Sequence, residues 1–79
     1  MDRDVVMKKV TGIFRDVFYD AELVVSDSTS AEDIEDWDSI MQITLIEEIE
    51  RVFDIKFKLK EIVELKTVGQ TVDLICSKL

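Results

Sequence analysis

The residue with the clearest chemical potential in this 79-residue sequence is Ser39, within the run Asp38-Ser39-Ile40. Ser39 follows a long acidic stretch, so we expect its hydroxyl to be accessible. It also opens a helical segment, where unpaired backbone amides and the helix dipole can stabilise a phosphodiester. Ser and Asp are, however, also preferred helix caps, and Ser39 with Gln42 fits a capping box. From the residues alone, Ser39 is either a modification site or a cap.

Other reactive groups are few. The chain has no His, which is the side chain that most often transfers protons near neutral pH. Asp33, Asp36 and Asp38 could hold a divalent cation, but the spacing and the central Gly of an EF-hand loop are missing. Cys76 has no base nearby in the sequence and is expected to be a small core or surface residue rather than a nucleophile. We therefore expect no catalytic residue, no metal site and no enzymatic activity.

The charge of the chain is unevenly distributed. The sequence has 18 acidic and 10 basic residues, a net charge of -8. Residues 20–54 hold twelve of the acidic residues but one of the basic ones. This acidic field disfavours nucleic acid and favours basic protein surfaces. No apolar run approaches the ~20 residues of a membrane span, so membrane insertion is not expected. A single Cys favours a reducing compartment, and we expect the cytoplasm.

Four segments show helical spacing of apolar residues: residues 4–19, 39–53, 58–65 and 67–79. Thr67 and Gln70 form a capping-box pattern at the start of the last segment. The run 55–59 alternates like a strand, but without a second strand a connector is favoured. Burial of the apolar faces against one another predicts an all-α four-helix bundle with three longer helices and one short third helix. The long loop between the first two helices spans residues 20–38, and residues 1–79 are expected to form a single domain.

The spacing also predicts which side chains are buried. The loop should be anchored to the core by five residues: Leu23, Val24, Val25, Ile34 and Trp37. The expected helical core positions are Val6, Val10, Ile13, Phe14, Val17, Phe18, Leu45, Ile46, Ile49, Val52, Phe53, Leu59, Ile62, Leu65, Val68, Val72, Ile75 and Leu79. Ile40 falls on the polar side of its helix. It is either covered by the long loop or left open for a partner.

The whole chain resembles the acyl carrier proteins. The resemblance rests on Asp38-Ser39-Ile40, on Thr67-Val68 before the last helix, and on a set within the second helix and its end: Ile43, Ile46, Glu47, Glu48, Ile49, Glu50 and Phe53-Asp54-Ile55. It implies that Ser39 receives 4'-phosphopantetheine from coenzyme A. Asp38 matches an Asp that is associated with Mg²⁺ during this modification. Ile40 matches a residue beside the arm that contacts partner enzymes.

The resemblance further implies a carrier that holds acyl groups as thioesters and presents them to other enzymes. The expected partners are a phosphopantetheinyl transferase, an acyl-loading ligase or acyltransferase, and a ketosynthase or another acyl-processing enzyme. Glu47, Glu48 and Glu50 are expected to bind these partners through weak, salt-sensitive contacts, with the carrier acting as a monomer. Acyl chains could fold back between the helices. The candidate lining residues, which ordinary core packing would equally explain, are Ile43, Ile46, Phe57, Ile62 and Leu65.

Some residues depart from the usual pattern of the family. Trp37 directly precedes Asp38, Ile40 replaces Leu, and Lys58 replaces a frequent Pro. These departures disfavour a housekeeping role in fatty acid biosynthesis. They favour a specialised pathway such as polyketide, aminoacyl or surface-polysaccharide biosynthesis. The alternatives are an aminoacyl cargo and a carrier-like adaptor that binds partners without an arm. Trp37 either packs the loop onto the bundle or flanks the arm.

Overall fold

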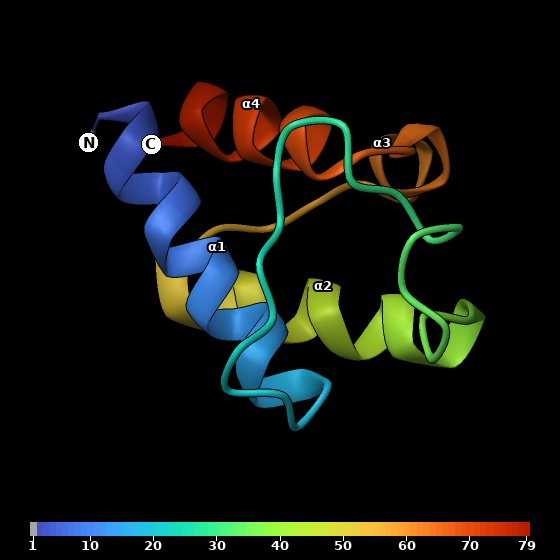
Figure 1. Cartoon of the computed structure of the whole chain (residues 1–79). Helices are drawn as coiled ribbons and strands as arrows, with labels where there is room; N and C mark the ends of the chain where they lie inside the picture. Colours follow the sequence, from blue (N-terminus) through green and yellow to red (C-terminus); the bar gives the residue numbers. More distant parts are fainter. Residues whose placement is uncertain (1) are drawn as a thin grey trace.

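A computed structural model describes residues 2–79 and contains four helices (Figure 1). They are α1 (Arg3–Val17), α2 (Ser39–Phe53), α3 (Leu59–Glu64) and α4 (Val68–Lys78). Within residues 2–79 there is no β-strand, only an isolated bridge between Ser30 and Thr67. The all-α prediction, with a short third helix and a long loop before α2, is therefore confirmed. None of the helices in this range is long and apolar enough to cross a membrane.

Local sequence explains where the three longer helices begin. Asp2, Asp38 and Thr67 are their N-caps, and each side chain accepts a hydrogen bond from a backbone amide of the first turn. The capping box predicted for Thr67 and Gln70 is present. By contrast, α1 ends at Val17, two residues before the predicted end, because Tyr19 adopts a left-handed conformation with φ of 53°. Asp54 does the same at the end of α2.

The core lies where α1 packs against α2 and α4. Its buried side chains are Val6, Val10, Ile13, Phe14, Val25, Leu45, Ile49, Phe53, Val68, Val72 and Ile75. Burial of one of the larger of these side chains contributes about 1.5–3 kcal/mol to the stability of the fold. Nearly all of these residues were predicted from helical spacing alone. The spacing therefore identifies the faces of α1, α2 and α4 that meet.

Four predicted core residues are instead exposed: Val24, Val52, Leu59 and Leu79. Val24 and Val25 are adjacent in an extended segment, where successive side chains point to opposite sides, and Val25 is the buried one. Leu59 is 76% exposed because it opens α3, a helix of six residues that buries none of them. Leu79 lies beyond the end of α4, and Val52 lies at the edge of the apolar face of α2.

The long loop is fastened to the start of α4. The Thr29 carbonyl accepts a hydrogen bond from the Val68 amide at 2.8 Å, and the Asp27 carbonyl accepts one from the Gly69 amide at 3.0 Å. These amides would otherwise lack partners, because the first turn of a helix has none within the helix. Gly69 is needed here, since a Cβ atom would lie 2.8 Å from the Asp27 oxygen. The contacts fix the middle of the loop.

Two further contacts hold the loop. Arg3 of α1 forms ion pairs with Asp27 of the loop at 2.6 Å and with Asp73 of α4 at 2.7 Å. Just before α2, the ring of Trp37 meets that of Phe14 edge-on, with 5.1 Å between centroids. Trp37 therefore packs the loop onto the bundle, as the first of the two alternatives predicted. The loop is thus fixed both in its middle and at the end that precedes α2.

Candidate functional site

Ser39 is the first residue of α2 and is exposed to solvent. The capping role considered for it belongs to Asp38, whose carboxylate accepts the Met41 amide at 2.9 Å. The predicted capping box of Ser39 with Gln42 is wrong, because the Gln42 side chain instead accepts a hydrogen bond from Trp37. Among the described residues, the Ser39 hydroxyl has no hydrogen-bond partner. The hydroxyl is therefore exposed and is not held by another group of the described residues.

The start of α2 is suited to an anion. The backbone amides of Ser39 and Ile40 lie in the first turn of α2, where the helix itself offers them no acceptor. The Asp38 carboxylate accepts the Met41 amide instead. The helix dipole adds partial positive charge at this end. No acidic residue occupies the first turn itself. A phosphodiester on Ser39 would therefore lie against two unpaired amides, with Asp38 as its one acidic neighbour in sequence.

An open groove of about 510 Å³ lies beside Ser39. It is lined by residues of the loop, α2, α3 and the α3–α4 connection: Ala31, Trp37, Asp38, Ser39, Gln42, Ile43, Ile62, Val63, Leu65 and Lys66. The lining is mostly apolar, with polar groups near the start of α2. The groove could therefore hold an apolar chain whose polar end is attached to Ser39.

The structure brings together some of the predicted acyl-pocket residues. Ile43, Ile62 and Leu65 line the groove. Ile46 is instead buried in the interior, and Phe57 packs against the core with the Lys78 amine 5.8 Å from its ring centroid. The groove also includes Ala31, Gln42, Val63 and Lys66, which the sequence analysis did not place there. It includes Trp37 as well, so Trp37 both packs the loop and lies beside Ser39. Gln42 could have been found, because it lies three residues after Ser39 on the same helical face.

Ile40, beside Ser39, is 73% exposed. The long loop therefore does not cover Ile40, which is open to solvent as the second of the two alternatives predicted. Ile43, one turn further on, is also exposed. The start of α2 thus presents an apolar surface next to the Ser39 hydroxyl.

The three acidic residues predicted to bind partners differ in their surroundings. Glu47 is exposed and has no hydrogen bond or ion pair within residues 2–79. Glu48 pairs with Arg51, and the hydrogen bond between them lowers the pKa of Glu48 below its ordinary value. Glu50 accepts the Phe57 amide at 2.8 Å. Glu47 is therefore the carboxylate most available to a partner.

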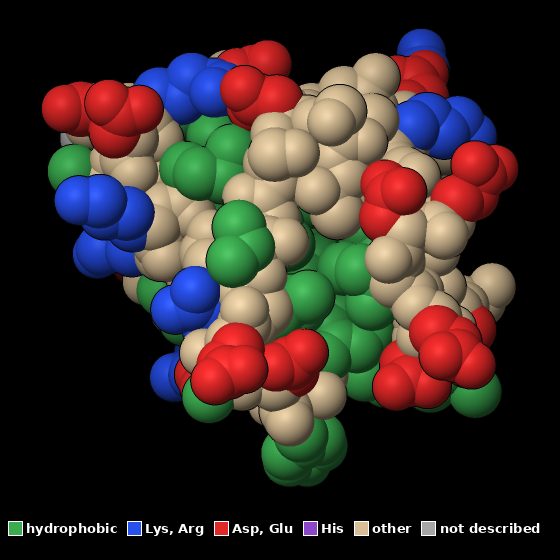
Figure 2. Space-filling model, viewed as in Figure 1, with side chains coloured by type: hydrophobic (Ala, Val, Ile, Leu, Met, Phe, Trp, Pro, Cys, Tyr) green, Lys and Arg blue, Asp and Glu red, His purple; other side chains and the backbone are tan. Residues whose placement is uncertain are grey.

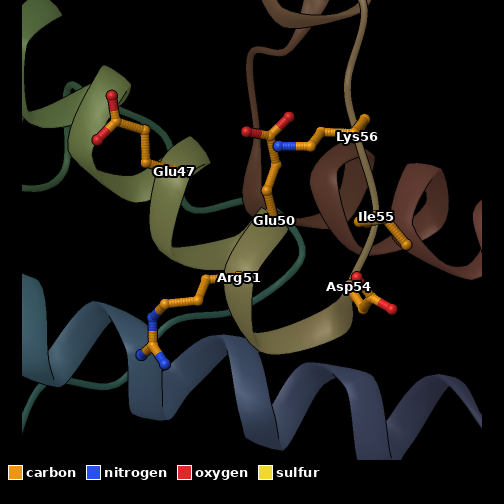
Figure 3. Close-up of a pocket in the computed structure, with 6 residues that line it drawn as sticks. All are labelled: Glu47, Glu50, Arg51, Asp54, Ile55 and Lys56. Carbon is orange, nitrogen blue, oxygen red and sulfur yellow. The ribbon is translucent and has the colours of Figure 1, made fainter.

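Glu47 and Glu50 line an open cavity of about 520 Å³ at the far end of α2 (Figure 3). It is lined by Glu47, Glu50, Arg51, Asp54, Ile55 and Lys56. In Figure 3 the ends of Glu50 and Lys56 point toward each other, whereas Glu47 points away from them. The cavity contains charges of both signs, so it does not concentrate the acidic field.

No cluster of three or more acidic, Cys or His residues that could hold a metal ion occurs in the part of the chain that the structure describes. Two of the three Asp residues considered for a cation accept backbone amides instead. Asp33 accepts the Ser30 amide at 2.9 Å, and Asp38 caps α2. Cys76 is a partly buried free thiol. The chemistry of the site thus centres on one hydroxyl and one groove.

An accessible serine at the start of a helix, next to an open apolar groove, is the arrangement of a small helical carrier domain. Comparisons with known proteins agree. A family model described as phosphopantetheine attachment site matches residues 8–75. The solution NMR structure of a holo acyl carrier protein from Geobacter metallireducens is 42% identical, with a TM-score of 0.87. The match covers 92% of this chain and 84% of that one. No match was found among curated protein sequences.

The chain therefore belongs to the acyl carrier protein family. It is a carrier protein and not an enzyme, and its prosthetic group is a covalently attached phosphopantetheine. Such carriers interact with a phosphopantetheinyl transferase and with acyl-processing enzymes. The free hydroxyl, the unpaired amides and the open groove fit such a group.

Proposed function

We propose that Ser39 is the attachment residue for phosphopantetheine and that the arm presents acyl groups as thioesters to partner enzymes. The observation that supports this most directly is the exposed, unpartnered Ser39 hydroxyl at the first residue of α2. When bound, the arm supplies a thiol that forms a thioester with the cargo. The attachment joins the Ser39 oxygen to the phosphorus of the pantetheine phosphate of coenzyme A. The adenosine bisphosphate leaves, and the hydroxyl proton passes to the transferase or to water.

The chain's own residues have distinct roles in this proposal. Asp38 keeps the first turn of α2 formed, and its carboxylate lies next in sequence to the Ser39 hydroxyl, where Mg²⁺ can act during transfer. The first amides of α2 stabilise the phosphodiester. Ile43, Ile62 and Leu65 receive the apolar part of the cargo in the groove, while Ile46 and Phe57 support it from the core side.

Partner docking is proposed for the exposed side of α2. Ile40 supplies an apolar contact beside the arm, and Glu47 supplies a free carboxylate. Glu48 and Glu50 contribute their charge to the same acidic field. A partner with a basic surface around its active-site entrance fits this arrangement, and such contacts are fast, weak and sensitive to salt. We propose that residues 1–79 act as one carrier domain, as a monomer and in the cytoplasm.

The proposed pathway is specialised rather than housekeeping fatty acid synthesis. Trp37 before the Asp-Ser pair, and the basic residues Lys56, Lys58 and Lys60 around the start of α3, support this. The loading enzyme is a ligase or an acyltransferase, and a ketosynthase or another acyl-processing enzyme acts on the loaded carrier. An aminoacyl cargo is the second candidate, because the groove includes polar groups near Ser39 as well as apolar ones.

The test uses mass spectrometry. The purified protein, coenzyme A and a phosphopantetheinyl transferase should yield a product heavier by one arm, with the added mass on the peptide that contains Ser39. Ser39→Ala should remain folded and gain nothing. Ser28→Ala, which changes an exposed serine of the long loop, should be modified at the wild-type rate. A mass gain in Ser39→Ala, or none in the wild type with several transferases, would contradict the proposal.

The remaining alternative is an adaptor that binds partners without an arm. The free hydroxyl of Ser39 and the groove beside it argue against this, since neither is needed for docking alone. Mass measurement of the protein purified from its native host separates the two functions. An acyl carrier gives the mass of the chain plus the arm, with or without cargo, whereas an adaptor gives the mass of the chain alone.

A further inference from the structure

Gln42 has a fixed orientation at the groove. The Trp37 indole nitrogen lies 2.7 Å from the Gln42 side-chain oxygen. An indole N–H can only donate, so the group that faces it must be the amide oxygen. The amide nitrogen of Gln42 therefore points away from Trp37, and it has no acceptor among the residues that the structure describes. Gln42 also lies about one helical turn after Ser39, on the same face and in the same groove.

Lys66 lines this groove from the opposite wall, in the connection between α3 and α4. Its backbone amide donates to the Gln70 side-chain oxygen at 2.7 Å, so the point from which its side chain extends is fixed. Within residues 2–79 its ammonium group forms no ion pair. The side chain of Lys66 is flexible enough to reach across an open groove.

The groove beside Ser39 thus contains several hydrogen-bond donors that lack acceptors among the described residues. Among its ten lining residues Lys66 is the one base and Asp38 the one acid, and the Asp38 carboxylate already accepts the Met41 amide. The Gln42 amide nitrogen, the Lys66 ammonium group and the first amides of α2 are all donors without acceptors. An anion with several acceptor oxygens would satisfy this set.

We propose that Lys66 and Gln42 bind the phosphodiester of the arm and so hold the attached end of the arm in the groove. The inference rests on attachment at Ser39. A phosphodiester has one negative charge and accepting oxygens, so it can receive N–H groups from Gln42 on one side and Lys66 on the other. Lys66 also offsets the repulsion between the new charge and a protein of net charge -8. Trp37 is the positioning residue for Gln42, and the pair directs the arm along the groove toward Ile43 and Leu65.

Lysine acetylation compares the free and modified proteins. The arm thiol and Cys76 are first alkylated, and both proteins are then treated with a limiting amount of an acetyl N-hydroxysuccinimide ester. Acetylation of Lys66 should be about two- to fivefold slower in the modified protein, the range that an exposed ion pair provides. Lys60 is the internal control, because it is exposed on α3 and does not line the groove. Its rate should not change.

Phosphorus NMR of the modified protein tests the same contacts from the side of the ligand. Lys66→Gln should narrow the phosphodiester line because the phosphate becomes more mobile, whereas Lys66→Arg should retain the wild-type line width. Gln42→Glu keeps an acceptor for Trp37 but replaces the donors with negative charge, so it should also narrow the line. The control is Lys60→Gln, which makes the same change as Lys66→Gln outside the groove. It should match the wild type.

The outcomes separate this inference from the proposed function. If the protein gains the arm on Ser39 but Lys66 is acetylated equally fast in both forms, the inference is wrong and the carrier function stands. Equal line widths for Lys66→Gln and Lys60→Gln would overturn it in the same way. If no arm is gained on Ser39, both the inference and the proposed attachment site are wrong.

Discussion

Asp38 and Ser39 are adjacent at the start of α2, and either residue type can cap a helix. Asp38 caps the helix, so Ser39 is left without an intramolecular partner. If Ser39 were the cap, its hydroxyl would accept a hydrogen bond from a backbone amide. That hydrogen bond would compete with the proposed attachment at Ser39. The order Asp-Ser therefore supplies a stable helix start and leaves the Ser39 hydroxyl unpartnered for the proposed attachment.

Substitutions of Asp38 should separate its two roles. Asp38→Ala removes the cap and should lower the free energy of unfolding by about 0.5–2 kcal/mol. Asp38→Asn can still accept the Met41 amide, so it should remain close to wild type in stability. Both variants lack the carboxylate and should be modified more slowly by the transferase. Urea denaturation and the initial rate of mass gain are the measurements. If Asp38→Asn is modified at the wild-type rate, the negative charge of Asp38 has no role in the transfer.

Glu61 of α3 is the second residue with a defined electrostatic role. Its carboxylate accepts the Lys58 amide at 2.8 Å and pairs with Lys78 of α4 at 3.0 Å. The Lys58 amide, followed by the Lys78 side chain, lowers the pKa of Glu61 below its ordinary value. The ionised form is thus favoured in the folded state, and this connects α3 to the end of α4.

The pH dependence of stability follows from that direction. A carboxyl whose pKa is lower in the folded state stabilises the protein above its unfolded-state pKa. The contribution is lost as the pH falls through the folded-state pKa. Glu61→Gln should therefore have a lower Tm than the wild type at pH 6, and the difference should shrink toward pH 3. Thermal unfolding at several pH values measures this, with Glu64→Gln as the control on the same helix. A difference in Tm between Glu61→Gln and the wild type that stays constant with pH would contradict this prediction.

At the scale of elements, the two glycines of the chain should respond oppositely to substitution. Gly12 lies within α1, and a Cβ atom there would meet nothing within 4 Å. Gly12→Ala should stabilise the protein by about 0.5–1 kcal/mol, since Ala favours the helix. Gly69→Ala would place its Cβ 2.8 Å from the Asp27 carbonyl and should destabilise it by about 1–3 kcal/mol. Urea denaturation of both variants decides this, and a gain in stability for both would be the contrary result.

The elements themselves could largely be predicted from the sequence. The predicted limits of α2, residues 39–53, match the structure, because an N-cap and a sustained apolar stripe define it locally. The stripes of α1 and α4 were equally clear. Prediction failed where local pattern is weak, as at Leu59 in a helix of six residues and at Leu79 beyond the last helix.

The site could be predicted only in part. Ser39 could be singled out from its place at the start of a helix, and the resemblance to acyl carrier proteins indicated Ile43, Ile62 and Leu65. Val63 and Lys66 could not be predicted, because their places in the groove depend on where α3 lies. For Trp37 a place beside the arm was one of two alternatives, and the choice depends on where the loop lies. The loop is positioned by contacts between residues far apart in the sequence, such as Thr29 with Val68 and Arg3 with Asp27. No local pattern encodes these contacts.

At the scale of the whole molecule, charge is the dominant surface feature. On the face shown in Figure 2, acidic side chains gather around a hollow with hydrophobic side chains in it. Most of the acidic residues belong to residues 20–54, which include the loop and α2. A surface of this kind repels itself in the folded state and attracts basic partners.

Salt should therefore stabilise the protein. The Tm should rise between low ionic strength and about 0.15 M NaCl, where charges more than ~8 Å apart are largely screened. Added MgCl₂ should have the same effect. Differential scanning calorimetry across a salt series measures the change. A Tm that does not move over this range would mean that the acidic residues are too dispersed to repel one another appreciably.

Trp37 is the one tryptophan of the chain, and it forms part of the groove wall next to Ser39. Its ring is held by Phe14 and its nitrogen by Gln42, so its environment in the free protein is well defined. Any cargo that enters the groove displaces water from beside this ring. The ultraviolet emission of the protein therefore provides a built-in optical signal of occupancy. Loading and unloading could be followed in real time, without a dye or an isotope.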